Sequence, residues 1–298
     1  MSRVSLSAAR ADAADRAEVL WLGDPRAHDA ALTGGKAASL SRLAAGHRVP
    51  PGFVVAIPGA TLGRDARAAI TAAYGRLGAL TGVADPAVAV RSSAVDEDGA
   101  DASFAGQHDT YLNVSSAEQV WWAVAKCLAS FGGERALAYR RRAGLPAAPA
   151  RAAVLVQWLV PADASGVAFS ANPVSGARDE VVVNAAWGLG ESVVSGTVTP
   201  DAIVVGRDDF AIRAHDVADK RTMTVAVPGG TREVAVPGCL ARAPAVDAAQ
   251  ASAAARLAAA LEGETGGPVD IEVAWSGGEI FLLQCRPITT LSTDRSST

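Results

Sequence analysis

Residues 269–287, VDIEVAWSGGEIFLLQCRP, determine how this chain is interpreted. They predict a β-hairpin, because two runs rich in apolar and β-branched residues flank a Ser-Gly-Gly turn. Side chains alternate across a strand, so Asp270 and Glu272 share one face of the first strand, and Gln284 and Arg286 share one face of the second. If Glu272 lies opposite or near Gln284, a carboxylate, an amide oxygen and a guanidinium converge on one surface.

Such a polar cluster is costly inside otherwise apolar strands unless it has a function. Carboxylate and amide oxygens suit Mg²⁺, which prefers hard oxygen ligands and combines one or two carboxylates with the phosphates of a substrate. An arginine suits a phosphoryl group in transit, because its planar guanidinium can bind two phosphate oxygens at once. The hairpin therefore favours chemistry on a phosphorylated substrate.

Composition excludes several other classes of protein. The chain has 298 residues, half of them hydrophobic, which is enough for two lobes with their own cores. The formal net charge of −4 gives no reason to expect nucleic acid or an anionic membrane as a partner. The three cysteines are widely spaced and odd in number, so they predict neither a disulfide framework nor a zinc site. No signal peptide or transmembrane run is present in this sequence, so the cytoplasm is the default expectation.

Turn residues and changes of pattern divide the chain into four parts. Residues 1–18 are predicted to be a flexible polar start, and residues 291–298 a flexible tail. A linker containing Pro146 separates a first predicted lobe, residues 19–146, from a second, residues 147–290, that holds the hairpin. Short strands and alanine-rich helices occur on both sides of this linker. We therefore expect an α+β protein of two lobes with a cleft between them.

Two segments of the first lobe suit phosphate. Residues 33–36, TGGK, place glycines and Lys36 at a predicted helix start, where anions bind favourably, although the spacing is not that of a P-loop. Arg91 ends a predicted strand and can hold a phosphate through two hydrogen bonds. Ser103 and Gly106, in the long loop that follows, suit a mobile flap over phosphates. Two alternatives stay open: a plain helix start with a solvated lysine, and an ion pair between Arg91 and the nearby acids.

Two segments of the second predicted lobe are suited to contact the purine and the ribose of a nucleotide. Residues 154–160, VLVQWLV, predict an apolar strand that can offer backbone groups to a purine edge, with an ordinary core strand as the alternative. Residues 187–191, WGLGE, lack the spacing of a dinucleotide-binding motif, but their turn can place Glu191 near a ribose or a phosphate. The four histidines show no metal-ligand spacing, and no Gly-x-Ser-x-Gly motif supports a serine hydrolase.

Taken together and in this order, the segments resemble the nucleotide-binding domain of the pyruvate phosphate dikinase and phosphoenolpyruvate synthase family, which includes the rifampicin phosphotransferases. Each motif is weak alone, but five in the family's order are highly specific. The resemblance covers about residues 20–290. The matching stretches are residues 34–40 with 49–53, 90–93 with 103–107, 156–157 with 165–169, 187–191 through 200–201, and 270–272 with 284–287.

The resemblance implies an ATP-grasp fold, in which two lobes grip ATP and Mg²⁺. It implies that Lys36 and Arg91 contact the phosphates of ATP. It also implies that Glu272 and Gln284 are the metal ligands. Arg286 matches the residue that stabilises the transferring phosphoryl group, in a reaction that depends mainly on positioning and charge.

The remaining contacts implied by the resemblance concern the flap, the adenine and the ribose of the nucleotide. They fall on Ser103 and Gly106 for the flap, on Gln157, Trp158 and Leu159 for the adenine, and on Glu191 for the ribose. Lys220 lies where the family often has a lysine after its Pro-Asp motif.

Full-length members of the family continue into a swivelling domain with a phosphorylatable histidine, and none of the four histidines here lies in the corresponding Thr-Ser-His-like motif. We therefore expect an ATP- and Mg²⁺-dependent phosphotransferase that passes a phosphoryl group to a histidine on a separate chain. In that route the β-phosphate moves, so AMP is the expected product. Two alternatives stay open: direct phosphorylation of a small molecule, which would give ADP, and a nucleotide-binding module that has lost catalysis.

Overall fold

The structure is a computed structural model that describes residues 17–58, 62–63, 65–93, 110–134, 137, 141 and 151–288. The chain divides into two compact units. The first comprises Met1–Gly46, Pro50–Leu159 and Pro228–Gly230, and the second comprises His47–Val49, Val160–Val227 and Thr231–Thr298. The predicted α+β class with two lobes is confirmed. Ser103, Gly106 and the predicted lobe boundary at residue 146 lie outside the described residues.

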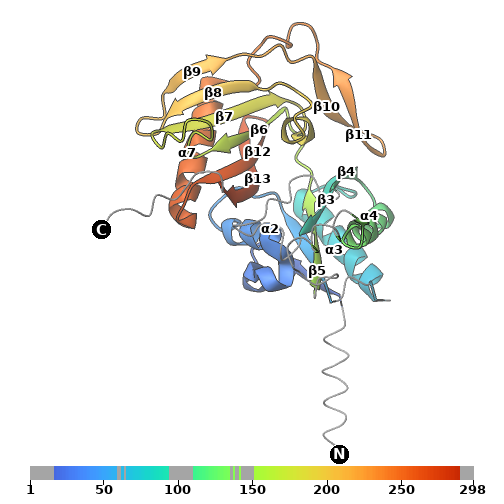
Figure 1. The fold of residues 1–298 in the computed structure, drawn as a ribbon. Helices are drawn as coiled ribbons and strands as arrows, with labels where there is room; N and C mark the ends of the chain where they lie inside the picture. Colours follow the sequence, from blue (N-terminus) through green and yellow to red (C-terminus); the bar gives the residue numbers. More distant parts are fainter. Residues whose placement is uncertain are drawn as a thin grey trace, which may run out of the picture. The chain divides into compact units, whose positions relative to one another are not determined.

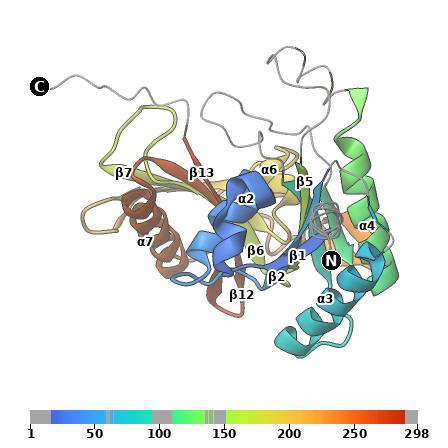
Figure 2. The same ribbon diagram turned by 90° about the horizontal axis from the view of Figure 1, so that it is seen from below.

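The first unit is built on an antiparallel five-stranded sheet (Figure 1). Its strand order is β1 (Glu18–Trp21), β2 (Gly52–Pro58), β5 (Arg151–Trp158), β3 (Val88–Ser93) and β4 (Thr110–Val114). Helices α3 (Ala66–Thr81) and α4 (Ala117–Ser130) pack together over one face of this sheet, and α2 (Ala30–Leu43) packs on the other (Figure 2). A short 3₁₀ helix, η1 (Pro25–His28), precedes α2.

Strand β5 lies in the centre of the first sheet, between β2 and β3. Its consecutive residues Val154, Leu155 and Val156 are all fully buried, because helices cover both faces of the sheet. Such a strand is a continuous apolar run without alternation. The predicted linker at Pro146 assigns β5 to the second lobe, whereas its pairing with β2 and β3 assigns it to the first unit.

The second unit is built on an antiparallel six-stranded sheet. Its strand order is β13 (Glu279–Pro287), β12 (Val269–Ser276), β6 (Ala164–Phe169), β7 (Glu180–Trp187), β8 (Asp201–Gly206) and β9 (Ile212–Asp216). The short helix α6 (Glu191–Val194) and a two-stranded ribbon of β10 (Thr222–Val227) and β11 (Gly230–Ala235) complete it.

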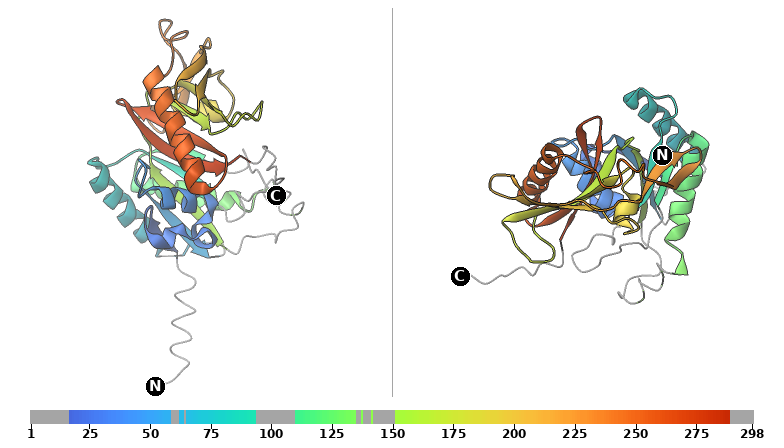
Figure 3. Two further views of the ribbon diagram at one scale, coloured as in Figure 1. Left: turned by 90° about the vertical axis from the view of Figure 1, so that its left-hand side faces the viewer. Right: turned by 90° about the horizontal axis from the view of Figure 1, so that it is seen from above.

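Helix α7 (Ala248–Thr265) lies across one face of the second sheet (Figure 3). The helix begins with a capping box: the Asp247 side chain accepts a hydrogen bond from the Gln250 amide, and the Gln250 side chain accepts one from the Asp247 amide. The alanine-rich stripe and Leu261 of this helix are buried against the strands. None of the helices in the described part of the chain has the length and apolar character needed to cross a membrane.

Candidate functional site

The hairpin of β12 and β13 has the register that the sequence analysis required. Glu272 lies directly opposite Gln284, and Asp270 lies directly opposite Arg286. Opposed residues of an antiparallel pair point to the same face, and so do residues two apart on one strand. These four side chains therefore share one face of the sheet, which we call the hairpin face. A β-bulge follows immediately between Glu272 and Val273, a feature that is common beside active sites.

The two faces of β12 have different environments. Ile271 and Val273, which point away from the hairpin face, are completely or almost completely buried on the side that α7 covers. On the hairpin face, Glu272 is in register with Val167 of β6, and Asp270 with Phe169; both partners are partly exposed. Helix α7 thus supports the back of the hairpin and leaves the functional side chains on the more open face.

Asp270 and Arg286 form an ion pair on the hairpin face. Arg286 Nε donates to both carboxylate oxygens of Asp270 at 2.8 Å, and Asp270 is only 7% exposed. Burial raises the pKa of Asp270, and the Glu272 charge acts in the same direction, while Arg286 acts to lower it. Because the folded-state pKa lies above the unfolded value, ionising Asp270 costs folding free energy as the pH rises through the folded pKa. A buried ionisable group that is retained although its ionisation costs folding free energy is typical of functional sites.

The donor set of the hairpin face fits Mg²⁺ better than a transition metal. Glu272 offers a carboxylate and Gln284 an amide oxygen, directly opposed in register. The described residues contain no cluster of three or more His, Cys, Asp or Glu that could hold a metal ion by itself. A hard cation that takes the rest of its ligands from phosphate oxygens and water matches this sparse set. Zinc prefers histidine nitrogen and cysteine sulfur, and none of the four side chains of the hairpin face is a histidine or a cysteine.

Two residues of this face were given no role from the sequence. Asp270 could have been found from the hairpin register, since the residue opposite an arginine is its natural ion-pair partner. Asn184 of β7 is in register with Val167, the neighbour of Glu272, and so lies on the same face. Its partly buried amide makes no side-chain hydrogen bond within the described part of the chain. The signal for Asn184 is a single amide within the apolar run 181–186, VVVNAA.

In the first unit, the structure brings Lys36 to the end of the strand that carries Arg91. Lys36 Nζ donates to the carbonyl of Ser92, the residue after Arg91, at 3.3 Å. The Ala37 amide donates to Ser93 Oγ at 3.1 Å. The helix was predicted to open at residues 33–36; α2 instead begins at Ala30 and breaks at Gly34 before continuing. The two candidate phosphate contacts of this unit therefore lie close together, beside a helix segment that starts after the break.

The break in α2 requires glycine. Gly34 has a φ of +77°, and a Cβ at this position would lie 2.1 Å from the carbonyl oxygen of Ser93. Gly34→Ala should therefore lower the melting temperature of the protein and weaken nucleotide binding, since strained backbone costs about 1–3 kcal/mol before the steric clash is added. The measurement is thermal unfolding with a parallel binding titration.

Gly75→Ala is the matched control for Gly34→Ala. Gly75 lies inside α3 and has open space around the position of a Cβ. Alanine is the better helix former by about 0.8–1 kcal/mol, so this variant should be as stable as the parent or more stable. Equal melting temperatures for the two variants would contradict the need for glycine at position 34.

The predicted adenine segment lies at the end of β5. Gln157 is buried, and its Nε2 donates to the Pro50 carbonyl at 3.2 Å. The Trp158 and Leu159 amides donate to the carbonyls of Pro51 and Ala87, both at 2.9 Å. These N–H groups already have partners, so a purine edge at this strand end would have to use other groups. The adenine contact stays a prediction.

The turn that carries Glu191 is firmly held within the second unit. Gly188 has a φ of +78°, and a Cβ there would lie 2.4 Å from the Thr224 carbonyl oxygen. Ser165 Oγ donates to the Gly188 carbonyl at 2.8 Å, and the Leu189 amide donates to the Thr224 carbonyl at 2.9 Å. Glu191 itself is exposed and accepts a hydrogen bond from Thr231 Oγ1 at 3.1 Å. Its side chain is therefore accessible, and its ribose contact stays a prediction.

Lys220 occupies an interior position. Its ammonium forms an ion pair with Asp201, and both side chains are completely buried. Asp201 also accepts hydrogen bonds from the amides of Ala218 at 2.8 Å and Ala245 at 2.7 Å, and Lys220 donates to the Ala218 carbonyl at 3.1 Å. The pair fastens two loops to the start of β8, which is a structural role.

Lys220→Met should destabilise the protein by about 3–5 kcal/mol, because it leaves the Asp201 charge buried without its partner. Chemical denaturation measures this loss. Arg213→Met is the control, since Arg213 pairs with Asp209 at a site where both side chains are about half exposed, and its loss should have little effect. Similar unfolding midpoints for the two variants would contradict the structural role of Lys220.

Comparison with known proteins places these residues in a family. The chain matches the family model described as the pyruvate phosphate dikinase AMP/ATP-binding domain over residues 56–298. It is 37% identical over 317 residues to a probable phosphoenolpyruvate synthase of Methanocaldococcus jannaschii, covering 92% of this chain and 27% of that protein. It is 43% identical over 227 residues to a rifampicin phosphotransferase of Streptomyces sviceus, covering 76% of this chain and 26% of that protein. The chain thus spans about a quarter of the length of these curated relatives.

Among solved structures, one match is to the dinucleotide-forming acetyl-coenzyme A synthetase 1 of Ca. Korarchaeum cryptofilum, in complex with coenzyme A, Ca-AMPCP and HgCl+. The match has a TM-score of 0.43 and 12% sequence identity, and covers 97% of this chain and 99% of that chain.

Proposed function

The chain belongs to the family of pyruvate phosphate dikinase AMP/ATP-binding domains, and from this premise we propose that it is an ATP- and Mg²⁺-dependent phosphotransferase. One observation carries the proposal: the hairpin register opposes Glu272 to Gln284 and Asp270 to Arg286 on one face of the sheet. Phosphoryl transfer needs positioning and charge stabilisation more than covalent chemistry by the protein, and this face offers both.

Each predicted residue has a distinct task in this proposal. Glu272 and Gln284 would hold Mg²⁺, which would supply positive charge to neutralise the phosphate oxygens of ATP. Arg286 stabilises the charge on the phosphoryl group as it transfers. The ammonium of Lys36 and the guanidinium of Arg91 contact the phosphates. The other nucleotide contacts are proposed for Gln157, Trp158, Leu159 and Glu191, with the flap formed around Ser103 and Gly106.

We propose that the acceptor is a histidine on a separate chain and that AMP is the nucleotide product. In this route the β-phosphate forms a bond to the histidine nitrogen as its bond to AMP breaks, and the γ-phosphate is released to water as inorganic phosphate. The curated relatives are several times longer than this chain, so a carrier supplied from outside these residues is consistent with their size. The test is to incubate the chain with ATP and Mg²⁺, with and without a separately expressed histidine domain of a relative, and to separate the nucleotides by chromatography. AMP formed only with the histidine domain is the expected result.

Other outcomes of this experiment point elsewhere. If small-molecule acceptors are added in place of the histidine domain, ADP formation would replace the histidine route with direct kinase chemistry. ATP binding with no turnover under any condition would leave a nucleotide-binding module without catalysis.

A further inference from the structure

Ser170, the residue directly after β6, makes an unusual junction with the start of β12. The Ser170 amide donates to the Val269 carbonyl at 2.9 Å, and Ser170 Oγ accepts from the Val269 amide at 2.9 Å. One residue thus satisfies both backbone groups of Val269. Ser170 is completely buried and Val269 nearly so, so an apolar side chain at position 170 would leave the Val269 amide without this acceptor, at a cost of about 1–3 kcal/mol.

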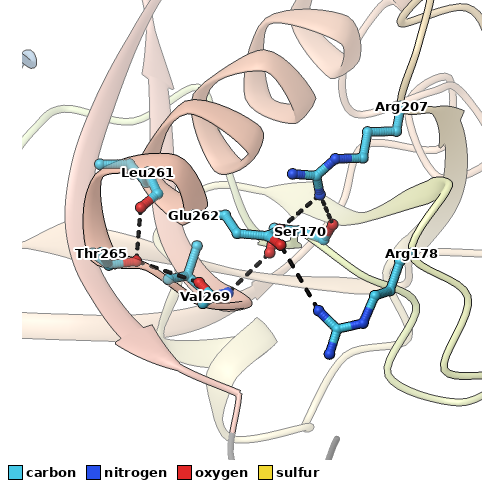
Figure 4. Close-up of polar contacts among 8 residues, drawn as sticks. Ser170, Arg178, Arg207, Leu261, Glu262, Thr265 and Val269 are labelled. Atoms are coloured by element: carbon cyan, nitrogen blue, oxygen red, sulfur yellow. Dashed lines mark hydrogen bonds and ion pairs between the residues drawn. The ribbon is translucent and has the colours of Figure 1, made fainter. Parts of the chain in front are cut away.

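This junction is itself fastened to helix α7 (Figure 4). Arg207 Nη1 donates to the Ser170 carbonyl at 2.7 Å and to Glu262 Oε2 of α7, also at 2.7 Å. Arg178 Nη1 lies 4.0 Å from the other oxygen of the same carboxylate, Glu262 Oε1. The helix that supports the back of the second sheet therefore also holds the place where β12 begins.

The next residue along β12 is Asp270, whose carboxylate accepts both hydrogen bonds of the Arg286 Nε. The start of β12 therefore sets where Asp270 lies, and Asp270 sets how Arg286 is oriented. We propose that Ser170 is a positioning residue: its hydroxyl fixes the start of β12 so that Asp270 holds Arg286 in its working orientation. The catalytic consequence rests on the proposed function, in which Arg286 acts on the phosphoryl group. A misplacement of about 1 Å in such a group lowers rates about 10²-fold.

Ser276→Ala is the control for Ser170→Ala. Ser276 ends the same strand, and its hydroxyl donates to the Pro161 carbonyl at 2.8 Å. Each variant therefore removes one hydrogen bond between a side chain and the backbone at an end of β12, but only Ser170 adjoins Asp270. Ser170→Thr keeps the hydroxyl and serves as the rescue variant. Glu262→Gln weakens the support from α7 without touching the buried serine, which keeps the test available if Ser170→Ala folds poorly.

The experiment has two readouts on the full chain. The first is the ¹H–¹⁵N resonance of the Arg286 Nε–H, assigned by its loss in Arg286→Lys; this readout needs no turnover. The second is AMP formation with the histidine domain, separated into kcat and KM for ATP. We expect Ser170→Ala to shift the Arg286 signal and to lower kcat about 10- to 100-fold with KM nearly unchanged. Ser276→Ala should change neither quantity, Ser170→Thr should restore both, and Glu262→Gln should shift the signal in the same direction.

An unshifted Arg286 signal in Ser170→Ala, or in Glu262→Gln if the serine variant does not fold, would overturn the positioning role whatever the activity. A shifted signal with unchanged kcat would uphold the positioning of Arg286 but overturn its proposed task in phosphoryl transfer. A fall in stability alone, with the signal and kcat unchanged, would reduce Ser170 to a structural residue.

Discussion

Arg286→Ala should lower the rate of phosphoryl transfer by about 10²–10³-fold while the affinity for ATP changes much less. Only interactions that are stronger in the transition state than in the ground state accelerate the chemical step. If Arg286 acts on the charge that develops on the moving phosphoryl group, its loss lowers kcat and kcat/KM together. Rapid-quench turnover and equilibrium binding of a non-hydrolysable ATP analogue measure the two effects separately. Equal losses of binding and turnover would instead make Arg286 a ground-state anchor.

Arg286→Ala also breaks the ion pair with Asp270. The loss of the arginine must therefore be separated from the effect of an unpaired Asp270 charge. Removing Arg286 takes away the group that acts to lower the pKa of Asp270, so a largely buried carboxylate is left without its partner. The double variant Arg286→Ala with Asp270→Asn removes that charge as well. If its turnover stays as low as that of Arg286→Ala, the defect belongs to the arginine. Arg213→Ala, which removes an exposed arginine of the same unit, should behave like the parent protein.

The hairpin could be predicted from the sequence because its two strands are adjacent in the chain and are joined by a short turn. A short turn fixes the pairing of two adjacent strands, and the period of two then fixes which side chains share a face. Counted back from the turn, where Ser276 lies opposite Glu279, these two rules alone would place Glu272 opposite Leu283. The β-bulge between Glu272 and Val273 shifts the register by one residue, and this shift brings Glu272 opposite Gln284 and Asp270 opposite Arg286. The sequence does not show this bulge, so the exact opposition of the polar residues becomes visible only in the structure.

The parts that sequence reasoning missed depend on contacts between distant segments. β5 looks like the start of a second lobe until its partners β2 and β3 are known. Gly34 looks like part of a helix start, and only the carbonyl of Ser93 shows why a side chain is excluded there. Lys220 lies where the family often has a lysine, and only its buried partner Asp201 shows that it has a structural role. The junction at Ser170 likewise joins segments about a hundred residues apart in the sequence, and no local sequence pattern predicts it.

Glu272→Gln should remove most of the Mg²⁺ dependence of nucleotide binding. Loss of a residue that merely supports a metal ligand costs 10–100-fold in metal affinity, so replacing the charged carboxylate ligand itself by a neutral amide should weaken Mg²⁺-dependent binding by about 100-fold. Binding of metal-free ATP should change little, because the positive groups assigned to the phosphates are intact. The measurement is a calorimetric titration with a non-hydrolysable ATP analogue at several Mg²⁺ concentrations. Glu233→Gln, at an exposed position of β11, is the control and should keep the full Mg²⁺ dependence.

The same substitution should not destabilise the fold, and this separates a metal ligand from a structural residue. The Glu272 charge contributes to the raised pKa of Asp270, so its removal lets that pKa fall toward the ordinary value. Ionised Asp270 then costs less folding free energy at neutral pH, and the melting temperature of Glu272→Gln without ligand should equal or exceed that of the parent. A residue whose loss weakens function without weakening the fold is typical of an active site. Unchanged Mg²⁺ dependence together with a lower melting temperature would instead assign Glu272 to the framework of the hairpin.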